Sequence, residues 1–405
     1  HGTQLQTYQD TPHGKPVRIH VQRKRYRCQA CGKTQFDPIP DLDSKRVTTT
    51  RLVQYICTHS TRETFAAIAR RVGLDEKTVK NIFEDYVADL EQKIRFVTPK
   101  YLGIDELKII GEYRCMITNV EHRTVFDMLP NRKKAELMPY FRNLRDKEKI
   151  EWVAMDMWGP YRDVVRATLP HARIVVDKFH IQRMANEVLE RMRKRLRKTL
   201  PDRQRLKLKD ERHLLLKRQH TLSPEALLRL QVWLKHFPQL GQAHGLKEGF
   251  FSIWDQSNRS SAETAYQQWE ASITDDLKTD FKDLTTAMRN WGDEVFAYFD
   301  HPITNAYTES VNNLAKGMNR MGRGYSFEVI RARMLYDAKA RKAGTVIVQE
   351  PAPERDEELR FERREFSAFM TRKSLRIPLR TDERVVEYGP YIPTLTRLLE
   401  ESYFE

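Results

Sequence analysis

Hydrophobic and polar positions change their spacing several times along this 405-residue chain. Apolar residues alternate at 17–21, as in a half-buried strand, whereas residues 45–95 show the three-to-four spacing of amphipathic helices. Helical spacing returns over 181–300 and again from Thr304 to about Ala343. Residues 345–405 are charged and contain several prolines, which is typical of a poorly ordered or clasping tail.

Between these helical regions lie short apolar runs, several of which end in acidic residues. The runs predict strands at 101–107, 113–120, 123–129, 151–157 and 172–177, and amphipathic helices at 133–144 and 161–169. The order β-β-β-α-β-α-β indicates three antiparallel strands extended by parallel strands with helical crossovers. We therefore expect an α/β domain with a ribonuclease-H-like fold, accompanied by helical regions.

Three acidic residues fall where this fold would bring them to one end of the sheet. Asp105 closes the first of these strands, Asp156 closes the fourth, and Glu309 lies on a helix near the start of the last helical region. Carboxylates are the ligands of hard divalent cations, and a pair of such ions can activate an attacking oxygen and stabilise a leaving one. The trio predicts Mg²⁺- or Mn²⁺-dependent phosphodiester hydrolysis or strand transfer, although single acids at strand ends often only form turns or caps.

A fourth acid leaves the second metal ligand open. Asp177 also ends a strand, and His180 follows it by three positions. Asp177 could replace Asp156 as the ligand, or Asp177 and His180 could support the site without binding metal. The plainer alternative is a histidine with purely structural partners.

The charge balance favours a polyanionic partner. The formal net charge is +15, which predicts DNA or RNA binding, although a basic enzyme without such a partner is the alternative. A glycine turn between two helical segments at 64–83, with Asp75 as a cap, indicates a helix-turn-helix. Predicted DNA contacts are Lys77, Lys80 and Asn81 there, Asn313, Lys316, Arg320 and Arg323 after Glu309, and Arg195, Arg197 and Lys198 in a basic run that is otherwise a solvated helix face.

Cys28 and Cys31 form a Cys-x-x-Cys-Gly-Lys turn, which is the spacing of a zinc knuckle and supplies two of four zinc ligands. Because the sequence starts without methionine, we expect a fragment whose other two ligands lie upstream; His13 and His20 are weaker candidates, and a metal-free pair is the alternative. Four cysteines make no disulfide framework and suit a reducing cytosol. Since there is no run of 18 apolar residues, no membrane span is expected.

Several of these motifs together resemble the bacterial insertion-sequence transposases of the ISL3 family. The matching segments are Arg25 to Thr34, the helix-turn-helix at 64–83, Gly103 to Glu106, Val175 to His180, Glu309 to Asn313 and Arg323 to Tyr325, and the likeness covers about residues 15–340. It implies a DDE transposase with a zinc ribbon, of which this chain lacks the first half. It also favours Asp105, Asp156 and Glu309 as the trio, with Asp177 and His180 in support.

The resemblance implies a homodimeric DNA transposase in the bacterial cytoplasm, at the nucleoid, that binds the terminal inverted repeats of an insertion sequence, cleaves its ends and joins them to target DNA. The alternatives are a ribonuclease-H-like nuclease or resolvase that does not join, and a domesticated DNA-binding regulator. The expected regions are a zinc-ribbon-like module at 1–40, a helix-turn-helix domain at 41–97, a catalytic domain at 98–180 and 301–345 interrupted by a helical insertion at 181–300, and a tail at 346–405.

Overall fold

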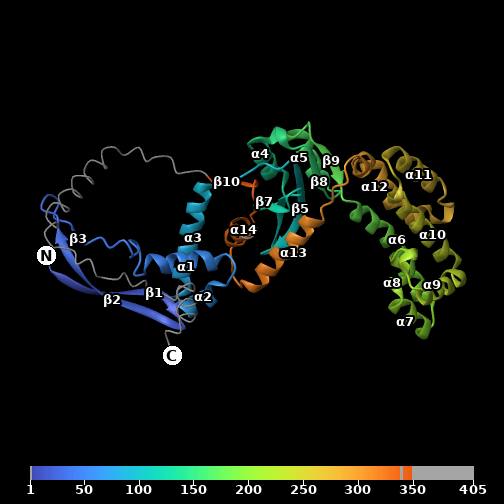
Figure 1. Ribbon diagram of the computed structural model, residues 1–405. Helices are drawn as coiled ribbons and strands as arrows, with labels where there is room; N and C mark the ends of the chain where they lie inside the picture. Colours follow the sequence, from blue (N-terminus) through green and yellow to red (C-terminus); the bar gives the residue numbers. More distant parts are fainter. Residues whose placement is uncertain (1, 338–340, 349–405) are drawn as a thin grey trace, which may run out of the picture. The chain divides into compact units, whose positions relative to one another are not determined.

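The computed structural model of the protein describes residues 2–337 and 341–348 (Figure 1). A long β-hairpin comes first: β1 (Thr3–His13) pairs antiparallel with β2 (Lys15–Arg27), and β3 (Thr34–Phe36) adds to β2. The β-rich character expected before residue 40 is confirmed. The alternation at 17–21 marks only the middle of β2, because the remaining hairpin positions are mostly polar and exposed.

Three helices follow, α1 (Thr50–Ser60), α2 (Phe65–Val72) and α3 (Glu76–Lys93). Gly73 ends α2 with a φ of 73°, a conformation that favours glycine at a helix C-terminus. The Asp75 side chain accepts a hydrogen bond from the Thr78 amide at the start of α3. The predicted glycine turn and aspartate cap are both confirmed.

A five-stranded sheet follows the helices, with the strand order β7-β6-β5-β8-β9. Its strands are β5 (Tyr101–Ile109), β6 (Glu112–Asn119), β7 (Thr124–Leu129), β8 (Trp152–Met155) and β9 (Arg173–Val176). The first three are antiparallel, while β8 and β9 run parallel to β5, as predicted. One expectation is wrong: Asp105 does not close β5, because β5 continues through the buried Leu107 and Ile109 to pair with β6.

Helices cover both faces of this sheet (Figure 1). One face packs with α4 (Lys134–Arg142) and α5 (Gly159–Thr168), and the other with α13 (Ala306–Met321) and α14 (Phe327–Tyr336). The continuous helix expected from 304 to 343 is therefore wrong in detail. The chain breaks after Met321 because Gly324 has a φ of 84°, and the Ser326 side chain then caps α14.

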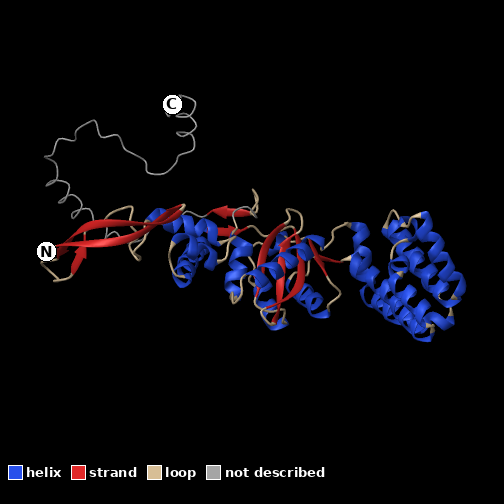
Figure 2. Cartoon of the chain, turned by 90° about the horizontal axis from the view of Figure 1, so that it is seen from below, coloured by secondary structure: helices blue, strands red, loops and turns tan. Residues whose placement is uncertain are grey.

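The region between β9 and α13 is helical, as Figure 2 shows. Its helices are α6 (Lys178–Thr199), α7 (Asp202–Asp210), α8 (Arg212–Leu216), α9 (Pro224–His236), α10 (Pro238–Ser252), α11 (Arg259–Ala271) and α12 (Asp275–Asp300). Helix α12 packs on β9 and α6, so one hydrophobic core continues from the sheet into this region. No helix in the described ranges is long and apolar enough to cross a membrane.

Short elements complete the fold. Three 3₁₀ turns are η1 (Lys147–Lys149), η2 (Gln219–Thr221) and η3 (Ile253–Asp255). Strand β4 (Ile94–Phe96) pairs antiparallel with β10 (Val346–Val348). The first residues of the expected tail thus form a strand, and the rest of that tail, from 349 to 405, lies outside the described residues.

Candidate active site

Strand register brings three aspartates to the carboxyl edge of the parallel strands. Met155, which precedes Asp156, pairs with Ile104 of β5 and with Val176 of β9. These two partners directly precede Asp105 and Asp177. Side chains at paired positions of parallel strands point to the same face. The three acids singled out at strand ends are therefore neighbours at one edge of the sheet.

Asp105 is the most enclosed member of the predicted trio, with 7% of the residue exposed. Its Oδ2 accepts a hydrogen bond of 2.7 Å from Nδ2 of Asn312 on α13, and its Oδ1 accepts one of 2.7 Å from the Glu106 amide. Burial, followed by the negative charge of Asp156, raises the pKa of Asp105 to about 7. A nearby cation would reverse this effect and hold the carboxylate ionised.

His180, in the first turn of α6, lies between the other two predicted ligands. Its Nε2 is 2.9 Å from Oδ1 of Asp156 and 3.3 Å from Oε1 of Glu309. Burial lowers the pKa of His180, but the adjacent Asp156 carboxylate outweighs burial and raises the pKa above its ordinary value. Because Nε2 of His180 lies between two carboxylates, it marks a position where this site favours positive charge.

Asp177 differs from Asp156 in what its oxygens contact. It is fully buried, with Oδ1 accepting from the Phe179 amide at 2.9 Å and Oδ2 accepting from the Asn305 amide at 2.7 Å. Burial raises the pKa of Asp177 even though these two amides favour the ionised form. Asp177 thus joins the start of α6, which carries His180, to the start of α13, which carries Glu309.

A buried polar face of α13 crosses the sheet next to these acids. The side-chain amide of Asn305 donates to the Ile104 carbonyl at 2.9 Å and accepts from the Thr308 hydroxyl at 2.6 Å. The Thr308 hydroxyl also lies 2.7 Å from that of Thr118 on β6. A Cβ atom on Gly103 would stand 2.5 Å from both threonine hydroxyls, so the close crossing of α13 over β5 requires glycine there.

Sequence reasoning missed this polar face. Asn305, Thr308 and Asn312 stand at i, i+3 and i+7, the spacing of a buried helical face, where apolar residues are the usual occupants. The sequence pattern favours instead Asn313 and Lys316 on the neighbouring face, where Asn313 is exposed and Lys316 is half-buried. The available signal was the helical spacing of three short polar residues around Glu309.

The carboxylates of the site are of the type that binds a hard divalent cation. In this structure, the carboxylates of Asp156 and Glu309 contact His180. Among residues 2–337 and 341–348, no group of three or more His, Cys, Asp or Glu side chains is arranged so that it could hold a metal ion. Nε2 of His180 occupies the position between Asp156 and Glu309. Carboxylate oxygens are the ligands that Mg²⁺ and Mn²⁺ prefer, so the chemical type of these side chains suits such an ion.

The two cysteines of the predicted zinc knuckle are exposed at the end of β2. The turn is closed by hydrogen bonds from the Cys28 amide to the Lys33 carbonyl at 2.8 Å and from the Gly32 amide to the Cys28 carbonyl at 3.0 Å. The histidine candidates are wrong. His20 lies within β2 and contacts Thr7 at 2.9 Å, and His13 ends β1, where it pairs with Lys15 at the end of β2 far from the cysteines.

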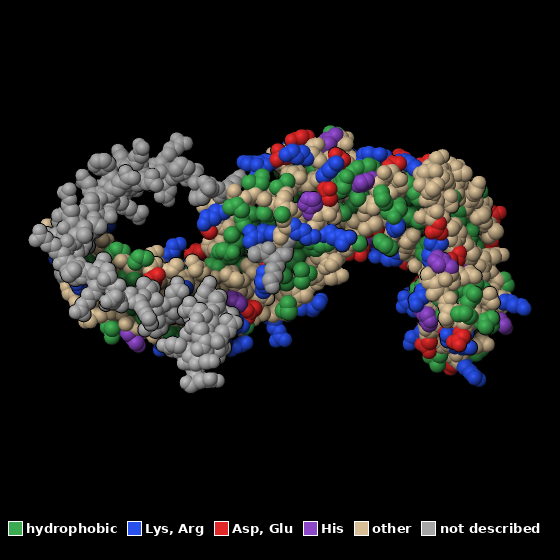
Figure 3. Space-filling view, in the orientation of Figure 1, with side chains coloured by type: hydrophobic (Ala, Val, Ile, Leu, Met, Phe, Trp, Pro, Cys, Tyr) green, Lys and Arg blue, Asp and Glu red, His purple; other side chains and the backbone are tan. Residues whose placement is uncertain are grey.

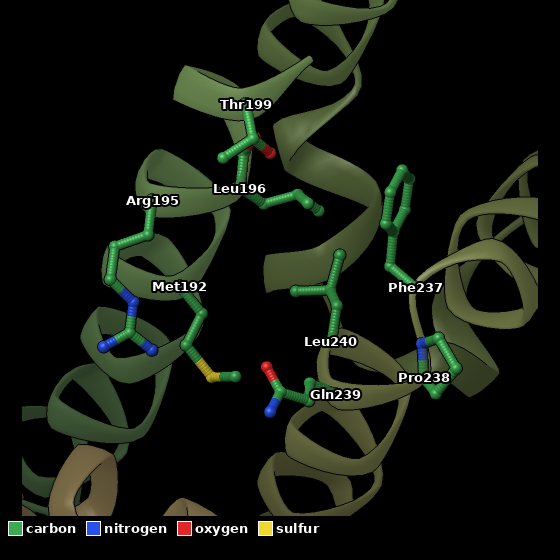
Figure 4. A pocket seen from close by; sticks show the side chains of 8 residues that line it. All are labelled: Met192, Arg195, Leu196, Thr199, Phe237, Pro238, Gln239 and Leu240. Carbon is green, nitrogen blue, oxygen red and sulfur yellow. The ribbon is translucent and has the colours of Figure 1, made fainter.

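Most of the predicted DNA contacts are exposed, and some of them also pair with acids. Exposed residues are Lys77, Lys80 and Asn81 on α3, Asn313, Arg320 and Arg323 at α13, and Arg195 and Lys198 on α6, and Lys80 pairs with Glu84 at 3.4 Å. Arg197 is half-buried, whereas Arg195 pairs with Asp280 at 2.7 Å and lines a pocket of about 340 Å³ between α6 and the start of α10 (Figure 4). Figure 3 shows Lys and Arg side chains gathered in a band across the central part of the side of the molecule that is in view.

Gly324 and Tyr325 follow α13 and form a Gly-Tyr motif that contacts the helix-turn-helix. The Tyr325 hydroxyl accepts a 3.1 Å hydrogen bond from the Phe65 amide at the start of α2. The buried Arg333 donates to the Glu63 carbonyl at 2.6 Å, and its guanidinium lies 4.9 Å from the centre of the Phe65 ring and 4.4 Å from that of Tyr325. The motif therefore packs α2 against the region that carries Glu309.

Comparisons with known proteins agree with this arrangement. A family model described as a transposase matches residues 102–334, and one described as the helix-turn-helix domain of transposase family ISL3 matches residues 38–87. The transposase for insertion sequence element IS1001 of Bordetella parapertussis is 24% identical over 337 residues, covering 80% of this chain and 82% of that protein. The transposase for insertion sequence element IS1557 of Mycobacterium tuberculosis is 25% identical over 288 residues, 64% of each chain.

Proposed function

Because this chain belongs to the ISL3 family of insertion-sequence transposases and is a DDE transposase, we propose that it binds the terminal inverted repeats of its element, cleaves at the ends and joins them to target DNA. The catalytic domain comprises residues 98–180 and 301–345, has a ribonuclease-H-like fold and is interrupted by the insertion at 181–300. The antiparallel-then-parallel order of its strands supports that fold.

Asp105, Asp156 and Glu309 are proposed as the ligands of Mg²⁺ or Mn²⁺. The observation that carries this assignment is the position of His180, whose Nε2 lies between Asp156 and Glu309 beside Asp105. Asp177 is assigned a positioning role, because both of its carboxylate oxygens already accept hydrogen bonds from backbone amides. When bound, divalent ions activate the attacking oxygen and stabilise the leaving oxygen.

The protein's own groups then have distinct tasks. Asn312 orients Asp105, and His180 places its Nε2 within reach of both Asp156 and Glu309, the residues that would hold a cation together with Asp105. The half-exposed Glu309 side chain, with 49% of its surface accessible, has room to turn toward the cation. Phosphates of the DNA are held by an exposed or half-exposed strip on and after α13, namely Asn313, Lys316, Arg320 and Arg323.

End recognition is assigned to the helix-turn-helix domain at 41–97. Lys77, Lys80 and Asn81 are exposed near the start of α3, where a recognition helix presents side chains to a groove. Cys28 and Cys31 in the module at 1–40 supply two zinc ligands. Since two ends are joined in one event, we propose that the protein works as a homodimer.

The test is cleavage and joining of a duplex that carries the element's own end, in Mg²⁺. We expect Asp105→Ala, Asp156→Ala and Glu309→Ala to lose cleavage while retaining end binding, and Asp177→Ala to lose less. Asp163→Ala is the matched control, because Asp163 is an exposed acid on α5 that pairs with Lys134 at 3.1 Å.

Each other outcome corrects a specific part of this proposal. If Asp177→Ala is inactive while Asp156→Ala still cuts, Asp177 is the second ligand. Normal cleavage by all three trio variants would remove the catalytic assignment of these acids, whereas a wild type that binds end DNA without cleaving it would indicate a DNA-binding regulator. Cleavage without joined products would instead identify a nuclease.

A further inference from the structure

Arg132, which follows β7, is held between two aromatic rings next to the carboxylate edge. Its guanidinium carbon lies 4.1 Å from the centre of the Tyr113 ring and 4.7 Å from that of Trp158. Trp158 is two residues beyond Asp156 and precedes α5. One guanidinium nitrogen, Nη1, donates to the carboxylate of Glu106, the residue after Asp105.

This enclosure fixes the plane of the guanidinium before any ligand arrives. A free arginine side chain gives up rotamer entropy when it is immobilised, and the two rings have already imposed that loss. The opposite edge of the group is still available. Within the described ranges, Nε and Nη2 of Arg132 bond no protein group and are not buried, and 28% of the side chain is exposed.

An Nε–Nη2 edge of fixed plane is the fork that binds phosphate oxygens in a bidentate manner. The position needs such a cation, because Asp105, Asp156 and Glu309 repel an approaching phosphodiester. Glu106 offsets part of the charge of Arg132, but it bonds the other nitrogen and leaves the fork open. We propose that Arg132, clamped by Tyr113 and Trp158, binds a backbone phosphate of the DNA strand next to the one held at the carboxylates.

The chain offers a matched arginine elsewhere on the same sheet. Arg173 also stacks on a tryptophan, 4.6 Å from the centre of the Trp152 ring, and also bonds a carboxylate, that of Asp300. Arg173 is the first residue of β9 and pairs with Trp152 at the start of β8. The starts of these strands lie at the edge of the sheet opposite to the acids. Arg173 therefore reports the effect of losing a stacked, paired arginine without the proposed phosphate.

The experiment compares Arg132→Lys and Arg132→Gln with Arg173→Lys and Arg173→Gln in the full chain. Single-turnover cleavage and equilibrium binding are measured on end duplexes, each with one neutral methylphosphonate at a different position near the cleavage site. One substituted phosphate should slow the wild type about tenfold to a hundredfold, the range of a lost charge-assisted pair. On unmodified DNA, Arg132→Gln should be as slow as the wild type is on the methylphosphonate duplex, and that methylphosphonate should not slow Arg132→Gln further. The Arg173 variants should cleave unmodified DNA within about twofold of the wild-type rate.

Arg132→Lys separates the fork from the charge: it should behave like Arg132→Gln, because lysine cannot bind phosphate in a bidentate manner. The proposal is overturned if every methylphosphonate slows Arg132→Gln as much as the wild type, which would leave Arg132 a purely structural clamp for Glu106. It rests on the proposed function, but its failure is distinguishable. If the wild type does not cleave at all, the proposed function fails, and the same methylphosphonate comparison in the binding measurement still tests Arg132.

Discussion

Gly103→Ala is expected to lift α13 from β5 and separate the carboxylates. The added Cβ atom would stand 2.5 Å from the hydroxyls of Thr118 and Thr308 and 2.8 Å from Oδ1 of Asn305. These groups cannot swing aside independently, because they are buried and hydrogen-bonded to one another. Overpacking of a well-packed site costs about 1–3 kcal/mol. A displacement of about 1 Å at the reacting groups can cost on the order of 10²-fold in rate.

The assays are chemical denaturation and single-turnover cleavage of end DNA, with Gly245→Ala as the control. Gly245 lies on α10, and a Cβ atom there meets nothing within 4 Å, so that variant should gain about 0.5–1 kcal/mol from helix propensity and cleave normally. Gly103→Ala should retain end binding while losing stability and cleavage together. A Gly103→Ala protein as stable and active as the wild type would refute the close crossing as the element that positions Glu309.

Three further predictions follow from the same contacts. Because a proton competes with the cation for Asp105, whose pKa is raised to about 7 by burial and by Asp156, Mn²⁺ affinity should fall about tenfold per unit as pH drops below 7 and level off above it; calorimetric affinities that agree at pH 5.5 and 8 would contradict this. His180→Asn should lower single-turnover cleavage about tenfold or more with unchanged end binding, because it removes the contacts of His180 with Asp156 and Glu309, and an unaltered rate would show that His180 does not support the site. Arg333→Ala should cost about 2–3 kcal/mol in denaturation, while the exposed Arg70→Ala stays within about 0.5 kcal/mol; equal losses would show that the contact with Glu63 is not what anchors the helix-turn-helix.

The sheet was predictable because its signals are local. Short apolar runs such as those before Asp156 and Asp177 give the strands, and a single glycine with a following aspartate marks the turn into α3. Their order alone then predicts which strands pair and which edge collects the acids. The error at Asp105 has a physical reason: β5 pairs with β8 only up to the preceding residue, and then continues with β6 alone.

The contacts between distant segments were not predictable from spacing. Asn312 and Asp105 are 207 positions apart, and no local pattern says that an asparagine on a helix will face an aspartate on a strand. Arg132 looked like one of many basic residues, because its meaning depends on two rings from separate elements. Arg195 shows the same limit, because the basic run in which it lies does not indicate that its partner in space is Asp280, 85 positions away.

The assignment of Asp156 as a metal ligand is the central claim, and Asp156→Cys tests it most directly. A thiolate is a poor ligand for Mg²⁺ and a better one for the softer Mn²⁺. We expect Asp156→Cys to bind end DNA, to be inactive in Mg²⁺ and to regain part of its cleavage in Mn²⁺, while Asp177→Cys shows no such difference between the two metals. Full cleavage by Asp156→Cys in Mg²⁺, or a metal-dependent rescue seen only for Asp177→Cys, would contradict the assignment.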